Sequence, residues 1–376
     1  MTTSPLAESI FLVVATSGRA IAQGLKALDY PVAVIDGFAD QDCLAAARVC
    51  IKVNRTSFSL EPTEVLNAVQ KIQSEYSIMG LFYDAAIESN PELINKIEAD
   101  FVYGNSISSL QQCKDAKQFF SVLEQYSIPY PEVRYDDGIE KQSNWLLKNQ
   151  HASGGIGVSM VHEKKLDLEF SYLQKKIKGI SFSITFIANG VAIKVLGANT
   201  QWSESLGATI PYAYAGAINQ VKLNDNIISV AEQYAELISS AYSLIGLNSI
   251  DCIYDGEVVH VLEVNPRIPA SYDLYETKYG DVMNAHIEAC KHKQLPKERI
   301  ESHLRAHAIV YAPKDIQIPN DMQWPLWTAD RPCSGERIPQ FEPVCNVYSG
   351  GKNHAQVCEM IASRKKTILS KVTAQN

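Results

Sequence analysis

The first hundred residues carry the hydrophobic pattern of an α/β domain. Short apolar runs typical of buried strands recur along this stretch, at residues 10–15, 31–35, 78–83 and 101–104. Ile21, Leu25 and Leu28 fall at helical spacing between the first two runs, and a second helix is expected over about 63–76. A strand, a helix and a second strand at this spacing predict a parallel βαβ unit. We therefore expect residues 1–105 to form a Rossmann-like domain.

The remaining pattern mixes strands with fewer helices. Apolar spacing predicts helices over 108–126, 227–244 and 356–370, and a strand over 306–312. Residues 143–268 are expected to alternate strands with two helices. Because strand ends of an open sheet face a ligand crevice, polar residues after the first-domain strands are candidates for substrate contact. They are Ser17, Gly18, Asp84 and Glu88.

A lysine and a glycine-rich loop follow one another in the middle of the chain. Residues 145–148 predict a strand that ends in Lys148, and the loop contains Ser153, Gly154, Gly155 and Gly157. Glycine lets backbone N–H groups approach phosphate oxygens closely, and lysine supplies positive charge to the same oxygens. The pattern predicts a phosphate-binding loop. A plain hairpin turn beside a solvated lysine is the open alternative.

A second motif carries oxygen ligands on a predicted hairpin. Residues 250–254 and 258–265 read as two strands joined by an Asp-Gly turn. Glu263 and Asn265 share one strand face, and the turn brings Asp251 opposite Glu263. Carboxylate and amide oxygens suit Mg²⁺ that also keeps water and phosphate oxygens. Arg267 follows at once and could hold a carboxylate or a phosphoryl group.

In this order the motifs resemble the ATP-grasp superfamily over roughly residues 5–300. The resemblance implies an α/β (α+β grasp) architecture with three parts: a Rossmann-like substrate domain over 1–105, a two-subdomain ATP-grasp domain over 106–300 and a small C-terminal α/β extension over 301–376. It implies ATP and Mg²⁺, or Mn²⁺, as cofactors, with Asp251, Glu263 and Asn265 as the metal ligands.

The resemblance also assigns the nucleotide contacts. They are Lys117, Lys148, Ser153, Gly154, Gly155, Gly157, Gln174, Lys175, Ile177 and Ser181. Lys114 is the alternative to Lys117 on the same predicted helix. The sequence departs from the family pattern where lysines replace the acids of the adenine hinge, and where Ser181 stands at the position of a ribose-binding acid.

By the same resemblance the chain would be a carboxylate–amine ligase. A carboxylate is phosphorylated by ATP, and an amine then displaces phosphate; Arg267 and Lys148 would be the catalytic residues. Arg19, Arg267 and Ser271 are the candidate substrate contacts. A kinase that phosphorylates a stable acceptor, or a nucleotide-binding module without ligase activity, are the alternatives.

The C-terminal segment resembles a smaller group of these ligases. Its motifs are Ala329-Asp330-Arg331-Pro332, Gly335–Ile338 and Glu342–Gly350. That group makes one-carbon coenzymes of the methanopterin and methanofuran types, and one member class joins glutamate to tyramine. The resemblance implies an amino acid as one substrate.

Composition limits the partners. The chain has 376 residues, 46% hydrophobic and 20% charged, and a formal net charge of −8, so bulk charge offers no field for a nucleic acid. Apolar runs are too short to span a membrane, and the start lacks the pattern of a secretory signal. Eight cysteines without a CxxC pair indicate reduced thiols in the cytoplasm. Small-molecule partners are expected, with a homodimer as an open option.

Three histidines are further candidate ligands. His303 and His307 are four residues apart, but they run into a predicted strand, so a structural role is the expectation. His151 lies in the glycine loop, where it could reach a phosphate or simply face solvent.

Overall fold

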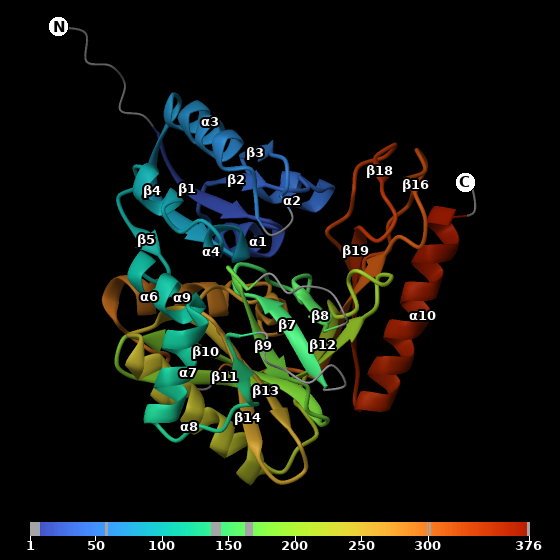
Figure 1. Ribbon diagram of the computed structural model, residues 1–376. Coiled ribbons are helices and arrows are strands. Elements are labelled where there is room, and N and C mark those ends of the chain that lie inside the picture. The colour runs from blue at the N-terminus through green and yellow to red at the C-terminus, as the bar shows by residue number, and fades with distance from the viewer. Residues whose placement is uncertain are drawn as a thin grey trace, which may run out of the picture.

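The N-terminal part is a doubly wound parallel sheet. The computed structural model describes residues 8–56, 59–136, 144–161, 168–298, 300 and 302–373. Five parallel strands in the order β3-β2-β1-β4-β5 form the sheet. They are β1 (Glu8–Ala15), β2 (Val32–Asp36), β3 (Val49–Lys52), β4 (Tyr76–Tyr83) and β5 (Val102–Tyr103). The expected βαβ unit is confirmed, and Figure 1 shows this sheet at one end of the molecule, above the other two large sheets.

Helices flank this sheet. Those of the N-terminal part are α1 (Arg19–Ala27), α2 (Gln41–Ala46), α3 (Pro62–Gln73), α4 (Ala85–Glu88) and α5 (Leu93–Lys96). The spacing of Ile21 and Leu25 correctly predicts α1, whose buried face carries both residues. Asp84 caps α4 by accepting a hydrogen bond from the Ala86 N–H.

A small antiparallel sheet follows, with two helices beside it. Its order is β6-β9-β7-β8, from β6 (Val133–Arg134), β7 (Trp145–Asn149), β8 (Val158–Met160) and β9 (Ser171–Lys175). The single helix predicted over 108–126 is wrong: α6 (Ile107–Lys114) and α7 (Ala116–Gln125) are separate helices. Asp115 leaves helical geometry and accepts a hydrogen bond from the Gln118 N–H, so it ends one helix and caps the next.

The largest element is an eight-stranded sheet. Its order is β14-β13-β10-β11-β12-β15-β19-β17. The strands are β10 (Ile180–Asn189), β11 (Ile193–Glu204), β12 (Ala213–Asn219), β13 (Ile245–Tyr254), β14 (Val259–Asn265), β15 (Arg305–Tyr311), β17 (Thr328–Ala329) and β19 (Pro343–Gly350). Two helices were predicted within 143–268, but the described part of that range holds one, α8 (Asp225–Ala241). The C-terminal strands extend this sheet through the pairing of β12 with β15.

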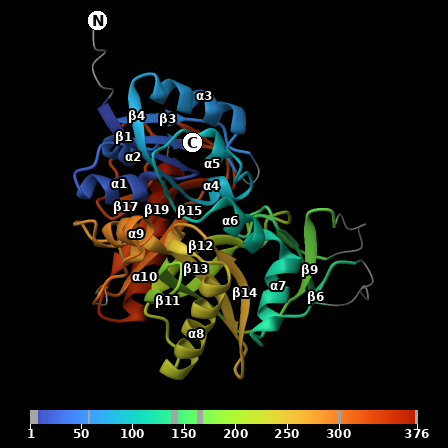
Figure 2. The same cartoon turned by 90° about the vertical axis from the view of Figure 1, so that its left-hand side faces the viewer.

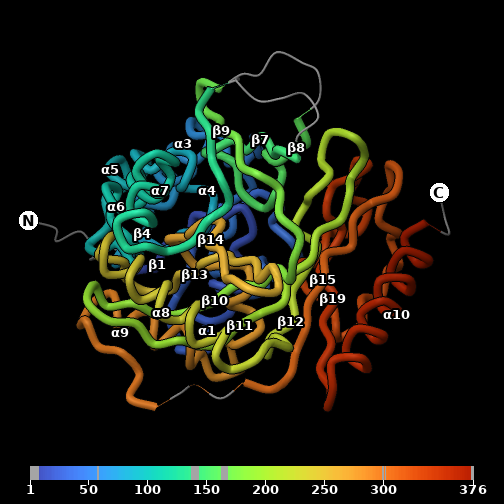
Figure 3. Tube along the Cα trace, turned by 60° about the horizontal axis from the view of Figure 1, so that its bottom comes forward, coloured from blue at the N-terminus to red at the C-terminus, as the bar shows by residue number. Residues whose placement is uncertain are grey.

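The other elements join these layers. They are the 3₁₀ turn η1 (Ala270–Leu274), α9 (Asp281–His292), β16 (Ile316–Gln317), β18 (Arg337–Ile338) and α10 (His354–Thr373). Figure 2 shows α9 between the parallel sheet and the large sheet, and Figure 3 shows α10 along β15 and β19. One hydrophobic cluster joins α1, β1, β13 and α9, so the N-terminal part and the large sheet share a core. In the described chain no helix is both long and apolar enough to cross a membrane.

Candidate active site

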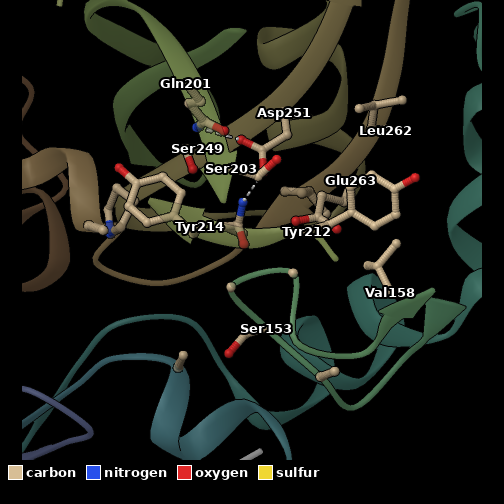
Figure 4. Close-up of a pocket in the computed structure, with 18 of the residues that line it drawn as sticks. Ser153, Val158, Gln201, Ser203, Tyr212, Tyr214, Ser249, Asp251, Leu262 and Glu263 are labelled. Carbon is tan, nitrogen blue, oxygen red and sulfur yellow. Dashed lines mark hydrogen bonds between the residues drawn. The ribbon is translucent and has the colours of Figure 1, made fainter. Parts of the chain in front are cut away.

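A cavity of about 710 Å³ lies where the three larger sheets meet. The parallel sheet contributes residues after β1 and β4, the four-stranded sheet contributes β7 to β9, and the large sheet contributes β11 to β14. Strands β15 and β19 add His307 and Asn346. The volume is in the range of small-molecule and cofactor sites. Figure 4 shows the loop of Ser153 on one side and the strands of Asp251 and Glu263 on the other.

The predicted acid pair sits on the β13–β14 hairpin. Asp251 and Glu263 are direct partners in the strand register, as the alternation and the Asp-Gly turn predict. Gln201 Nε2 donates to Asp251 Oδ1 at 3.1 Å, and Asn265 Nδ2 donates to Asp251 Oδ2 at 3.2 Å. A bulge after Asp251 leaves Leu262 as the extra residue, and Leu262 lines the cavity.

The two carboxylates have different acidities. Burial, and then the charge of Glu263, raise the pKa of Asp251 to about 7. Burial alone would raise the pKa of Glu263, but Lys148, Lys114, the hydrogen bond from Asp251 and Arg267 together lower it. Because the two adjacent carboxylates differ in this way in pKa, a cation bound between them would stabilise the form in which both are ionised.

The protein offers some of the oxygen donors that Mg²⁺ needs, and a bound ligand and water would supply the rest. Asp251, Glu263 and Asn265 offer hard oxygen atoms on one face of the hairpin. Among the described residues, no cluster of three or more His, Cys, Asp or Glu could hold a metal alone. Because Mg²⁺ keeps waters and binds phosphate oxygens, two carboxylates and an amide are an adequate protein share.

Three of the cationic side chains that line the cavity act on Glu263. They are Lys114 on α6, Lys148 on β7 and Arg267 after β14. Glu88 on α4 holds two of them, since its Oε2 lies 3.0 Å from Lys114 Nζ and 3.0 Å from Arg267 Nε. Burial opposes ionisation of Glu88, but Arg267 and then Lys114 lower its pKa below the ordinary value. Glu88 is therefore an ionised carboxylate that orients two cations.

Lys117 lies elsewhere. Its side chain is exposed and its Nζ lies 5.3 Å from the ring centroid of Tyr135, and it is not among the residues that line the cavity. The structure brings Lys114, and not the predicted Lys117, to the cavity. The helix break at Asp115 explains the difference, because it changes the direction of the chain between them.

The glycine loop is seated against β12. Gly154 and Gly155 have positive φ angles of 62° and 74°. The Tyr214 N–H donates to the Gly154 carbonyl at 2.8 Å, and a Cβ on Gly155 would lie 1.9 Å from the Tyr212 carbonyl oxygen. Ser153 and Gly157 also line the cavity. Tyr212 and Tyr214, which no sequence signal singled out, thus hold the loop over the cavity (Figure 4).

The predicted hinge residues line the cavity at the end of β9. Gln174 is 1% exposed and its Nε2 has no partner among the described residues. Lys175 is exposed and forms an ion pair with Glu132 at 3.5 Å. Ile177 and Ser181 complete this part. Val158 and Leu262 add apolar surface from two different sheets, which suits a planar base and which sequence reasoning did not identify.

The residues predicted to contact the substrate differ in whether their polar groups are free. Arg267 lines the cavity beside the acid pair, and its Nη2 donates to Asn265 Oδ1 at 2.8 Å. Ser271 also lines it, but its hydroxyl is bonded to that of Thr185 at 2.6 Å. Arg19, expected to bind a substrate carboxylate, is instead paired with Asp273 at 2.6 Å and Asp330 at 3.0 Å. Two protein carboxylates already occupy the guanidinium, so the free carboxylate receptor expected here is absent.

The other residues that the sequence suggested as candidates lie partly at the cavity and partly away from it. Ser17 and Asp84 line the cavity, and Asp84 accepts the N–H groups of Thr16 and Ser17. Gly18 donates its N–H to Asp36. His151 packs near Phe170 and does not line the cavity, whereas His307 does. All eight cysteines are free.

The sequence of the middle of the chain is similar to that of known proteins. The ATP-grasp domain family matches residues 113–271. A carbamoyl phosphate synthase large chain from Clostridium acetobutylicum is 25% identical over 234 residues, which is 56% of this chain and 21% of that protein. The chain therefore spans about a fifth of the length of this curated relative.

Solved structures share the fold across the chain. An L-amino acid ligase from Bacillus licheniformis superposes with a TM-score of 0.69 at 13% sequence identity. The superposition covers 97% of this chain and 98% of the ligase chain. The biotin carboxylase domain dimer of 2-oxoglutarate carboxylase from Hydrogenobacter thermophilus, solved with MgADP and bicarbonate, has a TM-score of 0.69 at 10% identity, with 98% and 91% covered. At these identities the likeness concerns the fold. Residues 113–271 thus match the ATP-grasp domain family, and the chain as a whole shares the fold of these solved structures.

Proposed function

We propose that this chain is an ATP-dependent ligase that joins a carboxylate to an amine and releases ADP and phosphate. The observation that carries the proposal is the meeting of two carboxylates and three cations beside the glycine loop. Asp251 and Glu263 come from the large sheet, whereas Lys148 comes from the four-stranded sheet and Lys114 from helix α6. This division suits phosphoryl transfer, which depends on positioning and charge neutralisation rather than on an enzyme nucleophile.

The proposed reaction has two steps. A carboxylate oxygen of the substrate attacks the γ-phosphorus, the bond to ADP breaks, and an acyl phosphate forms. The amine nitrogen then attacks the carbonyl carbon, the phosphate departs with the electron pair, and the nitrogen loses a proton. Lys148 and Lys114 would neutralise phosphate oxygens, and Arg267 would orient the carboxylate and the acyl phosphate.

Mg²⁺ is the proposed metal, with Asp251, Glu263 and Asn265 as its protein ligands. Bound there, it would supply positive charge to the phosphate oxygens. Val158, Leu262 and the hinge after Gln174 are the proposed adenine contacts. Ser153, Gly154, Gly155 and Gly157 are the proposed phosphate contacts, with Lys175, Ile177 and Ser181 along the nucleotide.

The narrower proposal concerns the substrates. The C-terminal motifs support a ligase of one-carbon coenzyme biosynthesis, of the methanopterin or methanofuran type, with an amino acid as the carboxylate held by Arg267. A small-molecule carboxylate and amine are then the partners, and free thiols suit a cytoplasmic location. A homodimer is part of this proposal, supported by the dimeric neighbour.

Isotope transfer tests the reaction. A candidate carboxylate labelled with ¹⁸O is incubated with ATP, Mg²⁺ and amines, and the released phosphate is examined by mass spectrometry. Labelled phosphate is expected together with amine-dependent ADP release. Label retained in a stable phosphorylated product would instead establish a kinase, and turnover that requires bicarbonate as the only carboxylate would contradict amide formation.

A variant links the reaction to the acid pair. Glu263→Gln keeps the size of the side chain but removes its charge, so we expect ADP release to fall at least about 100-fold. Glu257→Gln, on the exposed hairpin turn, is the matched control. Full activity of Glu263→Gln, with normal thermal unfolding, would exclude the proposed metal site.

A further inference from the structure

A buried asparagine at the end of the N-terminal part binds the open end of the β13–β14 hairpin. Asn105 follows β5 and is 1% exposed. Its Nδ2 donates to the Pro266 carbonyl at 2.8 Å and to Asn248 Oδ1 at 2.7 Å, and its Oδ1 accepts the Ile245 N–H at 2.7 Å. Asn105 does not line the cavity, and the ligase reaction described above assigns it no role.

The two backbone partners fix the orientation of this amide. The Ile245 N–H is a donor and requires the amide oxygen, whereas the Pro266 carbonyl is an acceptor and requires the nitrogen. With the bond to Asn248, both hydrogens of the NH₂ group and the oxygen are used away from water. A hydroxyl or a carboxyl group at this position could not make all three bonds, so the contact depends on the amide of Asn105.

The Pro266 carbonyl belongs to the peptide unit that joins Pro266 to Arg267. The N–H of the same unit donates to the Asn265 carbonyl at 2.9 Å. Because a peptide unit is planar, holding its carbonyl on one side and its N–H on the other fixes the direction in which Arg267 leaves the backbone. Asn105 therefore acts on the starting point of the Arg267 side chain.

The far end of that side chain is held by the same N-terminal part. Glu88 Oε2 lies 3.0 Å from Arg267 Nε. Glu88 ends α4, which follows β4, and the last residue of β4 is Tyr83. The buried Tyr83 hydroxyl donates to the Asn105 carbonyl at 2.8 Å, so the segment that carries Glu88 is bonded to Asn105. Arg267 is thus held at its backbone and at its guanidinium by two connected segments.

We propose that Asn105 is a positioning residue for Arg267, which it places through the Pro266 carbonyl. This inference rests on the proposed function, in which Arg267 orients the carboxylate and the acyl phosphate, and it adds to that step a residue outside the cavity. A displacement of about 1 Å in a group that orients a substrate can reduce the rate about 100-fold. The N-terminal part would then set the geometry of the reaction as well as contribute to the cavity wall.

The position of Arg267 can be measured without any substrate. In protein labelled with ¹⁵N-arginine, the Nε–H signal of Arg267 is assigned by its loss in Arg267→Lys, and its chemical shift reports the ion pair with Glu88. Asn105→Ala removes all three side-chain bonds, so we expect this signal to move toward the shift of solvated arginines. Tyr83→Phe removes only the hydroxyl bond to the Asn105 carbonyl and should move it less, in the same direction.

Asn219→Ala is the matched control. Asn219 is also buried, and its amide likewise bonds two backbone groups, the His303 carbonyl and the Arg305 N–H, each at 2.8 Å. Its loss should lower stability without moving the Arg267 signal. An unchanged signal in Asn105→Ala, or an equal shift in Asn219→Ala, would overturn the proposal. If Asn105→Ala does not fold, Tyr83→Phe decides by the same comparison.

A reverse half-reaction separates this inference from the ligase function. With Mg²⁺, ADP and acetyl phosphate, a terminal oxygen of ADP attacks the phosphorus, acetate leaves with the electron pair, and ATP forms. In Asn105→Ala we expect kcat for ATP formation to fall at least about ten-fold, while the KM for ADP stays within about three-fold because Asn105 lies outside the cavity.

The outcomes of the two measurements are distinct. No ATP from the wild type would refute the acyl-phosphate step, and the NMR comparison would still decide whether Asn105 places Arg267. A wild-type kcat in Asn105→Ala, with the Arg267 signal displaced, would overturn the positioning role while leaving the ligase function intact.

Discussion

Single residues decide which lysine reaches the cavity. Lys114 and Lys117 are three positions apart and would share one face of a continuous helix. Asp115 interrupts that helix, so Lys114 turns toward Glu88 and the cavity while Lys117 lies beside Tyr135. The carboxylate of Glu88 then sets the position of Lys114 relative to Arg267.

Lys114 should therefore matter to turnover and Lys117 should not. Lys114→Met is expected to lower kcat/KM for ATP at least about 100-fold, the usual effect of removing one donor to a developing charge. Lys117→Met is the matched control and should stay within about three-fold of the wild type. ADP release measured over a range of ATP concentrations decides; equal losses in both variants would contradict this placement.

Local pattern predicts one half of the candidate site and misses the other. The hairpin register that pairs Asp251 with Glu263 follows from strand alternation and a tight turn, both readable in neighbouring residues. Asp273 and Asp330 meet Arg19 only because three distant segments pack together. No local period encodes such a contact, so the sequence suggested a free Arg19 where the structure has an engaged one.

At the scale of elements, the glycine loop and β12 form one unit. Gly155 packs so tightly on the Tyr212 carbonyl that only a residue without Cβ fits, and Tyr214 binds the Gly154 carbonyl. The loop comes from the four-stranded sheet and β12 belongs to the eight-stranded sheet. This contact connects the four-stranded sheet with the eight-stranded sheet across the cavity.

Gly155→Ala should separate loop and strand. The added Cβ would lie 1.9 Å from the Tyr212 oxygen, so the loop must move, whereas Gly154→Ala adds a Cβ with nothing within 4 Å. Both variants incur the cost of an alanine at positive φ, about 1–2 kcal/mol. Hydrogen exchange at the Tyr214 amide is expected to rise more in Gly155→Ala than in Gly154→Ala. Equal protection in the two variants would contradict the steric argument.

At the scale of the whole molecule, α9 joins parts that the sequence pattern treats as separate. His286 on α9 accepts the Leu247 N–H at 2.9 Å and contacts the Tyr103 carbonyl at 3.3 Å, so it connects β13 with β5. The apolar pattern predicts four of the five strands of the parallel sheet. It misses α2 and α9, whose places depend on surfaces supplied by other parts of the chain.

His286 should make stability depend on pH. Burial lowers its pKa to about 4, below the unfolded value near 6.5, so between these values the unfolded chain binds the extra proton. The contribution of His286 to the free energy of unfolding is then fully present above about pH 6.5. It decreases as the pH falls, by up to about 1.4 kcal/mol per pH unit.

Urea unfolding between pH 7.5 and 4.5 measures that slope. His286→Gln retains a hydrogen-bond acceptor but does not titrate, so its free energy of unfolding should vary less steeply with pH than that of the wild type. His303→Gln, at an exposed position, should leave the slope unchanged. A wild-type slope in His286→Gln would show that this imidazole does not carry the effect.

The eight-stranded sheet combines strands from the middle and from the last part of the chain, which has a consequence for synthesis on the ribosome. A nascent chain that has reached residue 300 already contains β12, but its partner β15 begins only at Arg305. Until then β12 is an open edge with unpaired backbone groups, a surface on which aggregation can start. Chaperone demand should therefore peak late in translation, and a product truncated near residue 300 should be insoluble rather than merely inactive.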